Sequence, residues 1–250
     1  MVGRGCPNVC AFCSPSIGKF NASPAAHVID EMHFWSEKYF FDYFFLYSEV
    51  AFDNEKYALE FCELYSKTLS IPWACQLRPD VRFETETYLR MKKAGCERLY
   101  YGFESGNDRI LNVMKKHSTI TDHVRNIERA RAAGLRVFGS FVLGHATETA
   151  EEINETLEFV DQYDLAENPK CGVAALLIYP GTGYYSLAEK MGLVDDPFRF
   201  ISSYSMKVSI SSDTVRENEN LSTESVRIFL YKDGITGSRL GKRIILIISS

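Results

Sequence analysis

The sequence lacks apolar runs long enough to cross a bilayer. Its main ones, 39–47, 137–144 and 244–250, fall well short of the roughly 20 residues that a spanning helix needs. It also lacks a basic excess: 28 Lys and Arg against 33 Asp and Glu give a net charge of −5, so nothing suggests tight binding to a nucleic acid backbone. Because no secretory signal precedes the first cysteine, we expect a cytoplasmic protein with reduced thiols.

The composition is that of an ordinary globular protein, with 46% hydrophobic and 24% charged residues. From about residue 40, short apolar or β-branched runs alternate with stretches of helical period. Strands are predicted over 42–48, 72–78, 97–104, 135–144 and 171–179, and helices over 27–39, 54–69, 86–95, 121–134 and 149–164. This alternation predicts an α/β fold with parallel strands, either an open doubly wound sheet or a full or partial β/α barrel.

Five residues that could form one site fall at or just past the predicted strand ends, where the active site of a β/α barrel lies. They are Cys6, Ser48, Arg78, Glu104 and Gly144. A sixth strand could be the stub MVGRG before Cys6, so that residues 1–200 form one core domain. The polar, Ser- and Asn-rich sequence that follows makes 201–250 an extension of uncertain structure.

Cysteine is concentrated in one place, GRGCPNVCAFCSP, where Cys6, Cys10 and Cys13 have the spacing C-x3-C-x2-C. A structural zinc site needs four protein ligands, and no second C-x-x-C pair is present, although His27 or His33 could complete a set. A 4Fe–4S cluster that is held by three thiolates keeps one iron open to a small molecule. The spacing therefore favours an iron–sulfur cluster, with zinc or incidental thiols as alternatives.

Four motifs in order resemble those of the radical S-adenosylmethionine (SAM) superfamily. They are the cysteine motif with Phe12 before its third cysteine, GFESG (102–106) followed by NDRILNVMKK, VLGHATETAEEINETLEF (142–159) and LLIYPGTGYYSLAEKMGL (176–193). The resemblance covers about 3–193. It implies a partial (β/α)6 barrel in which Cys6, Cys10 and Cys13 hold a 4Fe–4S cluster whose fourth iron binds SAM. Reductive cleavage of SAM then yields a 5′-deoxyadenosyl radical that abstracts a hydrogen atom from the substrate.

The resemblance also implies cofactor contacts for seven further residues. Phe12 is expected against the adenine, and Glu104 against the ribose or the amino group of SAM. Ser48 and Glu49 occupy the place of the motif that receives this amino group, although YSEV departs from its common forms. The remaining three are Lys116 for the carboxylate, Ser140 for the ribose, and Arg78 for cofactor or substrate.

Four of these residues have a structural alternative. Glu104 could cap a helix, Lys116 could be a solvated surface lysine, Ser140 could allow close packing, and Arg78 could pair with an acid on a loop. The aromatic run 39–47 is most simply a buried strand, and otherwise a wall on which substrate stacks. Cys62, Cys75, Cys96 and Cys171 are expected in the core. His117 and His145 lie near the expected barrel mouth, where His145 could face substrate or be a surface or capping residue.

The reaction outcome is open. The subgroup that the motifs resemble often carries an N-terminal cobalamin-binding domain, and its members methylate unactivated carbons or close rings, so methylation or ring formation is expected. Cobalamin would come only through a missing domain or a partner, and a reducing electron donor such as flavodoxin or ferredoxin is implied. Because the chain begins close to Cys6, we expect either a fragment or a module that relies on a partner. The opposing hypothesis is a non-catalytic, degenerate family member or a zinc-stabilised binding module.

Overall fold

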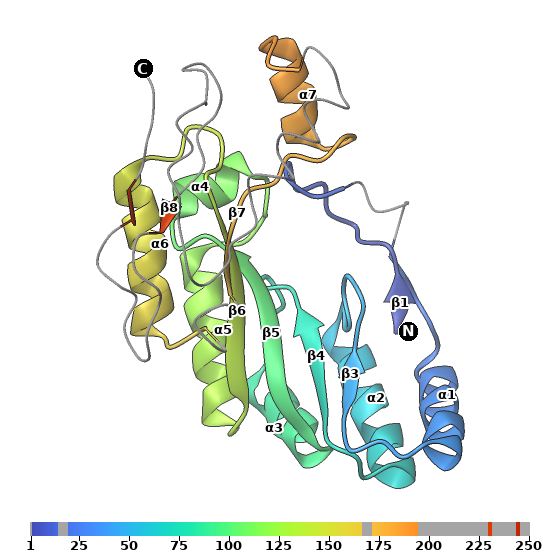
Figure 1. The fold of residues 1–250 in the computed structure, drawn as a ribbon. Helices are drawn as coiled ribbons and strands as arrows, with labels where there is room; N and C mark the ends of the chain where they lie inside the picture. The colour runs from blue at the N-terminus through green and yellow to red at the C-terminus, as the bar shows by residue number, and fades with distance from the viewer. Residues whose placement is uncertain (1, 15–19, 167–171, 195–229, 232–243, 246–250) are drawn as a thin grey trace. The chain divides into compact units, whose positions relative to one another are not determined.

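The computed structural model describes residues 2–14, 20–166, 172–194, 230–231 and 244–245 (Figure 1). The chain divides into two compact units. The first unit consists of residues 1–8, 16–103 and 117–139, and the second of residues 9–15, 104–116 and 140–250. Of the helices in the part of the chain that the structure describes, none combines the length and apolar character that a membrane crossing needs.

The main sheet has five strands in the order β3-β4-β5-β6-β7. Their bounds are β3 Phe44–Leu46, β4 Trp73–Leu77, β5 Cys96–Glu104, β6 Arg136–Leu143 and β7 Val173–Ala175. β3 pairs parallel with β4, β4 with β5, and β6 with β7. Strands that follow one another in sequence are therefore neighbours in a parallel sheet, with helices between them, which confirms the predicted α/β fold.

Helices of the first unit cover one face of its strands (Figure 1). Helix α2 (Glu55–Thr68) packs against α3 (Thr85–Lys93), which in turn packs against α5 (Ile120–Ala132). The fully buried side chain of Trp73, on β4, packs against α2 of this layer. Its ring centroid lies 5.4 Å from that of Phe61 and 5.9 Å from that of Tyr65. Cys62, Cys75 and Cys96 are buried as predicted, whereas Cys171 lies outside the described residues.

The N-terminal stub does not form a sixth strand of the main sheet in the described structure. Instead, β1 (Gly3–Arg4) pairs antiparallel with β2 (Asn21–Ala22), just before α1 (Ala25–Lys38). Gly5, with a φ of 84°, turns the chain directly after β1. The two residues of β1 are therefore too few to form a strand of the parallel sheet. The hydroxyl of Ser48 lies 3.1 Å from the Gly3 carbonyl oxygen and links β1 to the segment after β3.

The prediction that the aromatic run 39–47 is a buried strand is wrong. β3 contains only Phe44–Leu46, and Leu46 alone among these three is buried. Phe40 is fully exposed, and Phe45 is 43% exposed on the face opposite to Leu46. The Phe45 ring lies 5.4 Å from Tyr100, which stacks on Phe138 at 5.3 Å. Three strands thus contribute to an aromatic row, Phe45, Tyr100 and Phe138.

In the second unit, the segment after β5 packs closely on helix α6. This unit contains α4 (Asp108–Val113), α6 (Ala150–Gln162) and α7 (Gly183–Lys190). Gly106 approaches α6 so closely that an added Cβ atom would lie 2.8 Å from the Thr156 Cα, and the Gly106 N–H donates to the Thr156 hydroxyl at 3.0 Å. The second glycine of GFESG, Gly106, therefore allows a backbone approach that any other residue would obstruct.

Most of the predicted extension 201–250 lies outside the described residues. Within it, β8 (Leu230–Tyr231) pairs antiparallel with β9 (Ile244–Ile245).

Candidate functional site

The loop that carries Cys10 and Cys13 is held in place by two distant motifs of the second unit. The Cys13 N–H donates to the Cys10 carbonyl oxygen at 3.1 Å, which closes a tight turn. Between them, the Ala11 N–H donates to the Met114 carbonyl oxygen at 2.8 Å, and the Ala11 carbonyl accepts from the Tyr184 N–H at 2.9 Å. Residues after α4 and at the start of α7 therefore fix the backbone between these two cysteines.

Gly183, the last residue of the sequence PGTG, is the first residue of α7 and lies against the cysteine loop. A Cβ atom at this position would lie 3.3 Å from both the Cα and the carbonyl oxygen of Ala11. Thr182 begins the helix by accepting the Tyr185 N–H with its hydroxyl at 3.1 Å. The glycine and the threonine together bring the first turn of α7 against the cysteine loop.

A buried ion pair lies beside this loop. The Lys116 Nζ donates to Glu104 Oε1 at 2.9 Å, and the two side chains are 7% and 10% exposed. The ammonium group also lies 5.9 Å from the centre of the Phe12 ring. The structure thus brings together three of the predicted cofactor-binding residues, Phe12, Glu104 and Lys116.

The alternatives for Glu104 and Lys116 are wrong. Asn107, not Glu104, caps α4 by accepting the Ile110 N–H, and Lys116 is buried rather than solvated. Glu104 ends β5 with a φ of 70°, in the left-handed region that residues with a Cβ atom rarely adopt. An ammonium and a carboxylate side by side match the carboxylate and amino groups of a bound amino acid.

His145 belongs to the same group of side chains as Phe12, Glu104 and Lys116. It follows the end of β6, where the N–H groups of Gly144 and His145 donate to Glu148 Oε2 at 2.5 and 2.9 Å. The imidazole is buried, with Nδ1 3.2 Å from the Tyr184 hydroxyl and its ring 5.9 Å from that of Phe12. Burial lowers the pKa of His145 to about 4, so the ring is neutral near pH 7. His145 is thus neither a surface residue nor a helix cap.

Glu148 and Tyr184 belong to this group of side chains and were missed at the level of the sequence. Burial raises the pKa of Glu148, although the two backbone N–H donors act in the opposite direction. Its signal was its place three residues after His145, close enough to reach back to the turn that ends β6. Tyr184 follows the PGTG sequence directly, but nothing local shows that it meets His145.

Four predicted site residues belong to the first unit: Cys6, Ser48, Glu49 and Arg78. The Ser48 hydroxyl lies within hydrogen-bonding distance of two carbonyl oxygens, those of Gly3 (3.1 Å) and Val50 (3.0 Å), and Glu49 is exposed. Arg78 makes two hydrogen bonds to Asp80, at 2.9 and 3.0 Å, which is the pairing with a loop acid that the sequence left open. The other six belong to the second unit, among them Ser140, which is exposed on β6.

The cysteine thiols of the motif differ from the other described ones in accessibility. Cys6 and Cys10 are half-buried and Cys13 is exposed, whereas Cys62, Cys75 and Cys96 are buried. No three His, Cys, Asp or Glu side chains among the described residues are grouped so that they could hold a metal ion. In a 4Fe–4S cluster each thiolate binds a different iron, so its cysteine side chains need not gather as closely as around a single metal ion. Within the second unit, the accessible thiols of Cys10 and Cys13, the buried ion pair and the Phe12 ring are groups that fit such a cluster and SAM.

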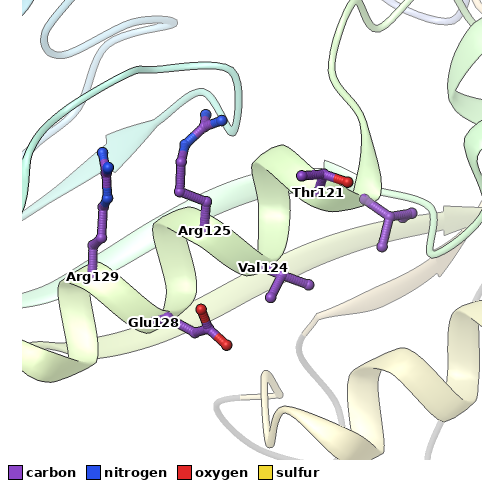
Figure 2. A pocket seen from close by; sticks show the side chains of 6 residues that line it. Thr121, Val124, Arg125, Glu128 and Arg129 are labelled. Carbon is purple, nitrogen blue, oxygen red and sulfur yellow. The ribbon is translucent and has the colours of Figure 1, made fainter.

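An open groove of about 370 Å³ runs along α5, lined by Ile120, Thr121, Val124, Arg125, Glu128 and Arg129 (Figure 2). Its two arginines are engaged: Arg125 pairs with Asp122 at 2.6 Å, and Arg129 with Glu84 at 3.0 Å. Their guanidinium groups also donate to the carbonyl oxygens of Val81 and Phe83. These bonds hold α5 against the segment 81–84, which precedes α3. We therefore interpret the groove as a structural surface.

Comparisons with known proteins identify the family. The model of the Radical SAM superfamily matches residues 1–160. The chain belongs to the radical SAM superfamily. It is 30% identical over 192 residues to an uncharacterized methyltransferase of Pyrococcus horikoshii, covering 75% of this chain and 41% of that protein. It is 26% identical over 201 residues to the anaerobic magnesium-protoporphyrin IX monomethyl ester cyclase of Rubrivivax gelatinosus, covering 79% and 35%. The chain thus spans less than half the length of either relative.

Solved structures show the same fold. The radical SAM methyltransferase TsrM from Kitasatospora setae, with cobalamin and a [4Fe–4S] cluster bound, matches with a TM-score of 0.64 at 17% identity, over 77% of this chain and 39% of that one. The cobalamin-dependent radical enzyme OxsB, with aqua-cobalamin and SAM bound, matches with a TM-score of 0.57 at 17% identity, over 81% and 30%. This likeness confirms the predicted partial β/α barrel, and the predicted cofactors, a 4Fe–4S cluster and SAM, are those of the family.

Proposed function

We propose that this chain is the catalytic core of a radical SAM enzyme that abstracts a hydrogen atom from its substrate during methylation or ring formation. The observation that carries the proposal is the buried Glu104–Lys116 pair, which lies beside Phe12 in the loop of Cys10 and Cys13. An enzyme that binds the methionine part of SAM needs one group for its amino group and one for its carboxylate, and this pair offers both.

The proposal gives each predicted cofactor residue a role. Cys6, Cys10 and Cys13 hold the cluster, which when bound supplies the electron that cleaves SAM to a 5′-deoxyadenosyl radical. Phe12 lies against the adenine. Ser48 and Glu49 serve the amino group, Ser140 the ribose, and Arg78 the cofactor or the substrate.

Charge balance explains how the ion pair serves binding. With no ligand, Glu104 and Lys116 neutralise each other at 2.9 Å, so neither charge is buried alone. When SAM is bound, Lys116 would pair with its carboxylate and Glu104 would accept a hydrogen bond from its amino group. Each member of the ion pair would then keep a polar partner, so neither would be left without one in a site of low dielectric.

The substrate side of the proposal rests on the aromatic row of the first unit. Phe45, Tyr100 and Phe138 present their rings on one face of three strands, and Phe45 is 43% exposed. One relative is named for a magnesium-protoporphyrin ester, a large planar ring. Such rings stack on aromatic side chains, which supports a planar, conjugated substrate.

Three further components complete the proposal. Cleavage of SAM needs one electron, so a donor such as flavodoxin or ferredoxin is required. Cobalamin, if the reaction uses it, is bound by a domain or partner outside this chain. With a net charge of −5, the chain gives no electrostatic reason for a nucleic acid partner, and we place the protein in the cytoplasm.

The test is reductive cleavage of SAM by protein that has been reconstituted with iron and sulfide without oxygen. With dithionite as the reductant, the native protein should release 5′-deoxyadenosine. Cys10→Ala should release none, whereas Cys62→Ala, which changes a buried thiol, should keep this activity. A fully loaded protein that leaves SAM intact would contradict the proposal and favour a non-catalytic family member.

A further inference from the structure

The His145 imidazole has one nitrogen that the fold leaves without a partner. The side chain is only 4% exposed, and Nε2 has no hydrogen-bond partner in the described structure. Buried polar atoms in folded proteins almost always have a partner, and those that lack one call for an explanation such as a ligand. His145 lies between Tyr184 and Phe12, with ring centres 5.8 and 5.9 Å away, so its surroundings belong to the proposed cofactor site.

The hydrogen bonds of the ring indicate which nitrogen carries the proton. Burial keeps the ring neutral by lowering the pKa of His145 to about 4, so it has a single N–H. The Val142 backbone forms a hydrogen bond with the ring, and a carbonyl oxygen can only accept. Because Nε2 has no partner, we assign the N–H to Nδ1, which also lies 3.2 Å from the Tyr184 hydroxyl. Nε2 therefore presents a lone pair and requires a donor.

The position of this lone pair is well fixed. Glu148 accepts the N–H groups of Gly144 and His145, which holds the backbone of the turn, and Tyr184 restrains the ring itself. An acceptor that is held from two sides can discriminate between ligands, because it cannot move away from a group that fails to donate.

From these contacts we infer that His145 Nε2 accepts a hydrogen bond from the exocyclic amino group of the SAM adenine. The inference rests on the proposed function, which places the adenine against Phe12, the neighbour of His145 at 5.9 Å. The amino group is the hydrogen-bond donor that the adenine ring offers, whereas its ring nitrogens only accept. His145 is then a specificity-determining residue that distinguishes adenine from a base with a carbonyl at the same position.

The experiment compares the binding of SAM with that of its inosine analogue, S-inosyl-L-methionine, which has an oxygen in place of the amino group. Dissociation constants are measured by equilibrium dialysis, without turnover, on the anaerobically reconstituted protein. The native protein should prefer SAM by about 10-fold or more, because the analogue sets two acceptors against each other. His145→Leu should lose most of this preference.

Two further variants keep the test decisive. Tyr184→Phe removes one restraint on the ring but keeps Nε2 and the Val142 hydrogen bond, so it should retain more of the preference than His145→Leu does. His145→Phe, which keeps a ring of similar size, replaces His145→Leu if the latter takes up no iron. Equal binding of the two ligands by the native protein overturns the inference, and so does an unchanged preference in the His145 variants. If iron-loaded native protein binds neither ligand, the proposed function itself fails, and that result is distinct from a loss of preference.

Discussion

The buried pair of Glu104 and Lys116 allows a sharp test of the site by a double-mutant cycle. Lys116→Met removes the ammonium but keeps an apolar side chain of similar length. It leaves the Glu104 carboxylate, 10% exposed, without the partner that lies 2.9 Å away. Removal of one member of a buried ion pair destabilises proteins by about 3–5 kcal/mol, so we expect a loss of about 3 kcal/mol in the free energy of unfolding.

The double variant should recover most of this loss. With Glu104→Gln added, no charge remains buried, and replacement of both members of such a pair is often close to neutral. The cycle should then give a coupling free energy of about 2 kcal/mol between the two side chains. The assay is urea unfolding of the protein without cofactors, with linear extrapolation to water.

A matched control is the surface pair of Lys67 and Glu63. Its two charged atoms lie 2.6 Å apart, but the side chains are 65% and 69% exposed. Lys67→Met should therefore change the free energy of unfolding by less than about 0.5 kcal/mol. If Lys116→Met were as mild as Lys67→Met, or if the two changes at 104 and 116 were simply additive, the buried pair would not exist as described.

Two further predictions concern packing and pH. Gly106→Ala should destabilise the protein by about 1–3 kcal/mol in urea unfolding, because the new Cβ atom would lie 2.8 Å from the Thr156 Cα; an unchanged midpoint would show that α6 does not approach so closely. For His145, the folded-state pKa of about 4 lies below the unfolded value of about 6.5, so the unfolded chain binds more protons between these two values. The contribution of this neutral ring to stability is complete above about pH 6.5 and is lost as the pH falls towards 4, by on the order of 3 kcal/mol. Unfolding measured across this range should therefore show a shallower pH dependence for His145→Leu, and equal slopes would contradict the burial of the ring.

Features that depend on local sequence could be predicted. The helix expected over 121–134 is α5, Ile120–Ala132, and its start is fixed by a capping box of Thr119 and Asp122. β5 ends at Glu104, and Gly144 follows β6 directly, as the strand ends in the sequence indicated. These elements follow from hydrophobic period and end signals that lie within a few residues of each other.

Burial of individual side chains could not be predicted in this way. Lys115 is exposed and Lys116 buried, and the sequence MKKH does not distinguish them. The difference arises because Lys115 and His117 both adopt left-handed backbone, with φ of 56° and 60°, so the chain turns Lys116 inward.

Long-range contacts account for the other errors. The exposure of Phe45 depends on which face of β3 the helices cover, and the burial of His145 depends on Phe12 and Tyr184, which are distant in sequence. The aromatic run 39–47 has the composition of a core strand, but only tertiary packing decides which of its side chains a neighbour covers.

The most direct test of the account is the metal content of the purified protein after reconstitution without oxygen. The account predicts about four iron and four sulfide ions per chain and a broad absorption near roughly 400 nm. Both should be absent from a variant in which Cys6, Cys10 and Cys13 are alanine. One zinc ion per chain in place of iron, or iron that persists in the triple variant, would contradict it.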